Sequence, residues 1–284
     1  MKTGCRSITA MWVILLVLVS GLLCAGGERE AIKVYGASIF TELVQGLGKA
    51  FMKEHPNVRV QVLGRSSEFG FLALLDKEAN LAMLAREATV VEKALAKRKG
   101  IQLKGELVAW ESVAVICHPG VGVTELTVGQ LRKIYDGDYK NWRDLGGADQ
   151  PIMLHGLAYP QGDLTVWFLH NVLSKADFTS GIIWVDTAHF LVQHVNVHRG
   201  SVAYLGNLQL TSVLKRQPQL KVQILRIRAN SGSPAFDPSP EVSKKGGYPL
   251  NIPLFFFWNE NNPDKRAEEF SQFCRDRLQR PVGK

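Results

Sequence analysis

The hydrophobic positions in the first part of the chain follow two alternating patterns. Residues 32–35 and 81–84 are short apolar runs typical of buried strands, and residues 58–63 alternate between apolar and polar positions. Apolar residues at helical spacing predict helices over 38–55 and 90–99. This alternation of strands and helices predicts an α/β fold with a mostly parallel sheet covered by helices.

The second part of the chain continues the alternation and holds the best local signature. Thr127 and Gln130 are spaced as a capping box at the start of a helix that ends near Asp136, and Gly137 follows as the stop. Further strands are predicted over 113–117, 152–154, 202–205, 222–227 and 255–258, and further helices over 165–173, 188–197 and 264–278. Residues 230–248 are rich in Gly, Pro and Ser and are predicted to be a loop.

The N-terminus is typical of an export signal. A short basic head precedes an apolar run over 8–23, and small residues follow. We predict a signal peptide over 1–26, cleaved after Ala25 or Gly26, which directs the protein to the periplasm or cell envelope. We expect no lipid anchor at Cys24, because Leu23 precedes it where acylation signals carry a small residue. An uncleaved membrane anchor is the alternative.

The composition excludes several classes of protein to which the chain could belong. The chain has 284 residues, of which 46% are hydrophobic and 21% are charged, so it is neither wholly disordered nor a polytopic membrane protein. The net charge of +8 indicates anionic surroundings without naming a partner. The basic stretch 93–104 lacks interleaved aromatic residues, so we expect no nucleic acid partner. Cys117 and Cys274 are expected to be buried free thiols.

The sequence carries no motif that predicts catalysis. It has no GxSxG, HExxH, P-loop or GxGxxG, and an enzyme is the less favoured class. His189, His194 and His198 surround a predicted helix, and Asp186 is near enough in sequence to be considered as a further metal ligand. Without a firm third ligand we predict no metal site and no cofactor.

Five segments, in order, resemble the phosphate-binding proteins of ABC importers, which have the type II periplasmic binding protein fold. The third is the most specific, and together the five span most of the predicted mature chain. They are Val34–Phe40, Gly64–Gly70, Leu126–Gly137, Arg199–Leu205 and Tyr248–Leu250.

The resemblance implies two α/β lobes joined by two crossover strands, with a ligand cleft between the lobes. Lobe one would comprise 28–110 plus 206–284, and lobe two would comprise 111–205. The implied function is reversible binding of a small inorganic anion such as phosphate, with hinge closure of a monomer and docking on an ABC permease.

An oxyanion site needs donors that converge from helix N-termini, where small residues let the backbone approach the ligand. Such residues occur at three predicted helix starts, and an arginine follows the strand over 81–84. The resemblance makes these the candidate ligand-binding residues: Ala37, Ser38, Ser66, Ser67, Arg86, Gly162 and Thr165. Plain helix capping is the alternative role of the hydroxyl residues, and a structural salt bridge is the alternative for the arginine.

The second ligand loop departs from the family's pattern. Tyr159 and Gln161 replace an arginine and an aspartate, Asp163 replaces a serine, and Leu164 replaces a glycine. In lobe one, Ala85 replaces an acidic or serine ligand. A negative charge at Asp163 would repel an anion unless the side chain points away or is protonated. These departures leave open a non-phosphate ligand, or a degenerate or repurposed envelope receptor of the same fold with no ligand.

Overall fold

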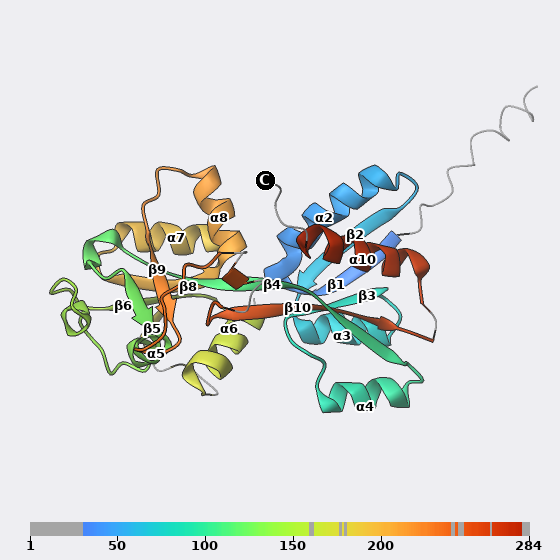
Figure 1. The fold of residues 1–284 in the computed structure, drawn as a ribbon, viewed down its shortest axis with the longest axis horizontal. Helices are drawn as coiled ribbons and strands as arrows, with labels where there is room; N and C mark the ends of the chain where they lie inside the picture. Colours follow the sequence, from blue (N-terminus) through green and yellow to red (C-terminus); the bar gives the residue numbers. More distant parts are fainter. Residues whose placement is uncertain are drawn as a thin grey trace, which may run out of the picture.

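The computed structural model describes residues 31–158, 162–175, 178, 181–239, 242–243, 247–261 and 263–279. Its elements form two groups that lie side by side, with strands β4 (Leu103–Cys117) and β10 (Asn251–Asn259) along the middle (Figure 1). We call the group that contains the N-terminal strands lobe one and the other group lobe two. The predicted signal peptide, Tyr159 and Gln161 lie outside the described residues.

Lobe one is built on a sheet in the order β2-β1-β3-β10-β4. The strands β1 (Ala31–Ala37), β2 (Arg59–Arg65) and β3 (Leu81–Leu84) are parallel, and β10 runs antiparallel to β3 and β4. Its helices are α2 (Thr41–Glu54), α3 (Ser67–Leu75), α4 (Val90–Arg98) and α10 (Lys265–Gln279). The predicted strands and helices of this lobe are present, with bounds that differ from the predictions by a few residues.

Lobe two is built on the C-terminal part of β4 and five further strands. These are β5 (Glu125–Thr127), β6 (Met153–Leu157), β7 (Ile182–Val185), β8 (Ser201–Gly206) and β9 (Gln223–Arg228). Its helices are α5 (Val128–Tyr135), α6 (Asp163–Phe168), the π-helical turn η4 (Leu169–Leu173), α7 (Ala188–Val197) and α8 (Asn207–Arg216).

The expected boundary between the lobes is not the one that the packing follows. Residues 207–228 were expected in lobe one as part of 206–284. They form α8, which was not predicted and packs on α7 and β8, and β9, which pairs with the C-terminal part of β4. Leu210 and Leu220 are buried in the same hydrophobic cluster as α7 and β8. Residues 207–228 therefore lie with lobe two.

The sheet is mixed, whereas the sequence predicted a mostly parallel one. The cause is β4, which pairs antiparallel with β10 over 103–112 and antiparallel with β8 and β9 over 113–117. Only 113–117 was predicted as strand, because residues 103–110 lack the continuous apolar run of 113–117, and in the structure only Val108 among them is buried. One strand thus runs without a break through both lobes (Figure 1).

A close helix–strand contact places the start of α3. A Cβ on Gly70 would lie 2.4 Å from the carbonyl oxygen of Tyr35, so only glycine lets α3 rest directly on β1. The N-terminus of α3 is thereby fixed beside the ends of β1 and β3, at the side of lobe one that faces lobe two.

Two local predictions are confirmed elsewhere. The Thr127 hydroxyl accepts a hydrogen bond from the backbone N–H of Gln130, and the Gln130 side chain accepts one from that of Thr127, at 3.1 and 2.8 Å. Cys117 and Cys274 are buried free thiols. Over the described ranges, no helix combines the length and the apolar character that a membrane crossing requires.

Candidate binding site

Residues of both lobes line a cavity of about 370 Å³. Lobe one contributes the first turn of α3 and the residues after β3, and lobe two contributes α6 and η4. The lining residues are Ser66, Glu68, Ala85, Arg86, Gly162, Asp163, Val166, Trp167, His170 and Asn171. The cavity thus lies where the resemblance placed the ligand cleft.

The first turn of α3 is held by two serines with different tasks. Ser66 is the N-cap, and its hydroxyl accepts a hydrogen bond from the backbone N–H of Phe69 at 3.2 Å. The side chain of Ser67 is buried, and its hydroxyl accepts a hydrogen bond from the backbone N–H of Ala85 at 3.0 Å. The Ser66 hydroxyl therefore caps α3, and the Ser67 hydroxyl holds the helix against the end of β3.

The backbone N–H of Ser67 is engaged across the cleft. It donates to Oδ1 of Asp163, the first residue of α6, at 3.0 Å. An N–H in the first turn of a helix is the donor that a bound anion would accept from, and the helix dipole favours negative charge there. The Asp163 carboxylate therefore stands where the resemblance predicted an oxyanion.

The surroundings of Asp163 disfavour the charged form of its carboxyl. Burial raises the pKa of its carboxyl, and the hydrogen bonds from Ser67 oppose that shift. Its Oδ2 is buried without a hydrogen-bond partner among the described residues. A negative charge at Asp163 was expected to repel an anion unless the side chain points away or is protonated. In the structure the side chain points toward the N-terminus of α3 and accepts the hydrogen bond from the Ser67 N–H.

Arg86 lines the cavity, but its guanidinium is already paired. It donates to both carboxylate oxygens of Glu92, at 2.8 and 3.0 Å, and to Glu68 at 2.8 Å. The hydrogen bond to Glu92 raises the pKa of Arg86, and burial opposes this less strongly. The alternative of a structural salt bridge is thus what the structure shows for Arg86. The two glutamates and Asp163 outnumber this one arginine.

The other predicted ligand residues lie away from the cavity wall. Ala37 is buried, and Ser38 begins the 3₁₀ turn η1 (Ser38–Phe40). The N-cap of α2 is Phe40, so Ser38 does not have the alternative role of capping this helix. Thr165 is buried inside α6, beside the phenol of Tyr204. Of the seven candidates, Ser66, Arg86 and Gly162 reach the cavity wall, and Ser67 lies directly behind it.

The histidines gather differently from the prediction. His194 and His198 lie with a third ring, His155 of β6, whose centroid is 5.6 and 6.1 Å from theirs. Burial, together with the charges of the two neighbours, lowers the pKa of His155 to about 4. In the part of the chain that the structure describes, no group of three such side chains is placed to hold a metal ion.

Part of the chain matches a known domain family. Residues 25–156 match the family model for the PBP superfamily domain. The resemblance that the five sequence segments indicated is confirmed, because the chain is similar in sequence to distant homologues among the PstS phosphate-binding proteins.

Particular relatives show how distant the similarity is. The phosphate-binding protein PstS of Staphylococcus haemolyticus is 26% identical over 84% of this chain and 78% of its own length. A substrate-binding protein from Clostridium perfringens with bound phosphate has a TM-score of 0.69 at 21% identity, over 86% of this chain and 92% of that one. An ABC-type phosphate transport receptor from Vibrio cholerae has a TM-score of 0.68 at 22% identity, over 88% and 96%. These relatives are binding proteins, not enzymes.

Proposed function

We propose that the protein is an exported solute-binding protein of the type II periplasmic binding protein fold whose cleft no longer binds phosphate. The observation that carries this proposal is the hydrogen bond from the Ser67 N–H to Asp163 across the cleft. The two lobes lie on either side of the cleft, lobe one being residues 31–112 with 251–279, and lobe two being residues 113–228.

Local charge supports the proposal. A phosphate ion that enters the cleft has to displace the Asp163 carboxylate from the N-terminus of α3, and it then meets that carboxylate and Glu68 as like charges. Arg86 offers little compensation, because its donors already bind Glu68 and Glu92. A divalent oxyanion is therefore disfavoured at neutral pH.

The cavity beside Asp163 suits a solute other than phosphate. Its volume of about 370 Å³ holds a small solute, and the Trp167 ring, the Asn171 amide and two carboxylates are on its walls. Such walls favour a neutral or positively charged solute over a divalent anion. Similarity to a phosphate-bound substrate-binding protein and to an ABC-type transport receptor supports solute binding with an ABC permease as the partner. The predicted export signal supports a role in the periplasm or envelope.

Calorimetric titration with phosphate at pH 7.5 tests the proposal. The unaltered protein should release no saturable heat at millimolar phosphate. Asp163→Ser, which restores the serine of the family's loop, should gain phosphate affinity by tenfold or more, because it frees the Ser67 N–H and removes one negative charge. Asp144→Ser, at an exposed aspartate of lobe two, is the matched control and should gain nothing. Tight phosphate binding by the unaltered protein would overturn the proposal.

A further inference from the structure

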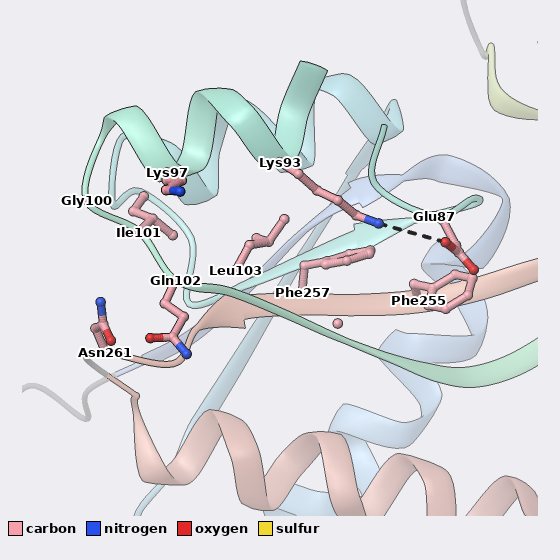
Figure 2. Close-up of a pocket in the computed structure, with 11 residues that line it drawn as sticks. Glu87, Lys93, Lys97, Gly100, Ile101, Gln102, Leu103, Phe255, Phe257 and Asn261 are labelled. Carbon is pink, nitrogen blue, oxygen red and sulfur yellow. Dashed lines mark ion pairs between the residues drawn. The ribbon is translucent and has the colours of Figure 1, made fainter. Parts of the chain in front are cut away.

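A second and larger cavity lies in lobe one, away from the interlobe cleft. It has a volume of about 740 Å³ and opens between helix α4 and strands β4 and β10 (Figure 2). No residue that lines it lines the interlobe cavity. It therefore has to be considered as a site of its own.

The cavity exists because α4 stands off the sheet. Of the nine residues of α4, only Ala96 is buried, and beneath the helix Leu103 and Phe255 of the sheet stay partly exposed while Phe257 is buried. The floor is formed by Leu103, Phe255 and Phe257, and Ile101 closes one end (Figure 2). Gly105 shapes this floor, since a Cβ there would lie 2.2 Å from the Phe257 ring. The ring can lie over β4 only because that residue is glycine.

The rim above this floor is positively charged. Lys93 and Lys97 are one helical turn apart on α4 and both line the cavity. Lys93 is 4.0 Å from Glu87, a loose pair of side chains that are 57% and 74% exposed. Lys97 has no ion pair among the described residues. Two ammonium groups thus border an aromatic floor, and one exposed carboxylate partly balances them.

We propose that this lobe-one cavity binds a small carboxylic acid whose apolar part is aromatic or short aliphatic. The carboxylate lies between Lys93 and Lys97, and the body covers the two phenylalanine rings and Leu103. The volume is in the range of small-molecule sites, which combine an apolar lining with a few charged or polar groups. Charge complementarity selects the acid over its uncharged analogue. The proposal does not depend on which solute the interlobe cleft binds.

Titration of the full chain with octanoate and with 1-octanol, followed by the methyl NMR signals of Ile101 and Leu103, tests the proposal. Octanoate should shift both methyl groups saturably and should bind about tenfold more tightly than octanol. The double variant Lys93→Gln/Lys97→Gln should lose about tenfold in octanoate affinity and keep its octanol affinity. A tenfold loss is about 1.4 kcal/mol, which is within the range of two exposed charge pairs.

The control is Lys49→Gln/Lys53→Gln, which removes two exposed lysines at the same spacing on α2. It should bind octanoate as the unaltered protein does. Equal affinities for octanoate and octanol, or unchanged octanoate binding in Lys93→Gln/Lys97→Gln, would overturn the proposal. Binding to phosphatidylglycerol vesicles through the two lysines, without saturable octanoate binding, would show that this cavity contacts a membrane surface instead. That result would also overturn the proposal.

Discussion

Asp163 and Ser67 belong to different lobes, and the carboxylate of the first accepts a hydrogen bond from the backbone N–H of the second at 3.0 Å. The Asp163 side chain also lies in the first turn of its own helix, α6. One carboxylate therefore faces the positive ends of two helices, one from each lobe. A ligand that closes a two-lobed receptor makes this kind of contact, and here the protein makes it with its own side chain.

The link between the lobes should depend on an acceptor at position 163 more than on its charge. Asp163→Ala leaves the Ser67 N–H without its partner, so the free energy of unfolding should fall by about 1 kcal/mol and the radius of gyration should increase. Asp163→Asn keeps a carbonyl acceptor and should stay compact. Urea unfolding and small-angle X-ray scattering check both variants. Equal compactness of Asp163→Ala and the unaltered protein would show that this contact does not hold the lobes together.

Burial of Asp163 should make the stability of the protein depend on pH, and Asp163→Asn tests this. Since burial raises the pKa of this carboxyl, the folded state holds its proton more tightly than the unfolded state. Its contribution to stability is therefore present at low pH and is lost as pH rises from the ordinary aspartate range through the raised value. Asp163→Asn should lack this loss, so its stability relative to the unaltered protein should increase over that window.

Phosphate binding in Asp163→Ser should increase further when Glu68 is neutralised. Glu68→Gln releases one side of the Arg86 guanidinium and removes a negative charge from the cavity wall. We expect a further severalfold gain in affinity by calorimetry. Glu87→Gln is the control, because Glu87 pairs loosely with Lys93 instead and does not line this cavity. The same gain in both variants would indicate a general effect of net charge.

The sequence predicted those elements whose signals are local. The capping box of Thr127 and Gln130 was found because its two residues are three apart in the chain. Helix α8 was missed, because its N-cap is Gly206 without a side-chain cap and the acceptor comes from Glu111 of β4, 97 residues away. A cap supplied from another element leaves no local signal.

The candidate site shows the same limit. Local motifs made Ser67 and Arg86 candidate ligand residues. Their hydrogen-bond partners come from other parts of the chain and could not be predicted from those motifs. The Ser67 N–H binds Asp163, which is 96 residues away, and Arg86 binds Glu68 and Glu92. The change from serine to aspartate was visible in the sequence, and the direction of its side chain was not.

Two glycines on helices of lobe one should respond oppositely to alanine. In Gly70→Ala the new Cβ would lie 2.4 Å from the Tyr35 carbonyl oxygen, so α3 has to move off β1 and stability should fall by more than about 1 kcal/mol. Gly46 of α2 has open space around it, and Gly46→Ala should stabilise the protein by up to about 1 kcal/mol. Thermal or urea unfolding measures both. A neutral Gly70→Ala would contradict the close contact.

Glu111 should make stability depend on pH between about 4.5 and 8. Burial raises the pKa of its carboxyl to about 8, against the hydrogen bonds that it accepts from α8. The folded state therefore keeps a proton that the unfolded state loses, so stability falls as pH rises through this window, by up to about 1.4 kcal/mol per pH unit. Glu111→Gln should flatten that slope in urea titrations, and Glu269→Gln, at an exposed site on α10, should leave it as it is.

The unbroken course of β4 has a consequence for how the protein comes apart. Residues 103–112 are paired in one lobe and 113–117 in the other, without an intervening linker. Unfolding of either lobe removes hydrogen-bonded neighbours from part of β4, and the other lobe needs this strand in its own sheet. Neither lobe should therefore persist alone as a stable intermediate. Differential scanning calorimetry should accordingly record one endotherm with matching van't Hoff and calorimetric enthalpies, in contrast to the two transitions of independently folding domains.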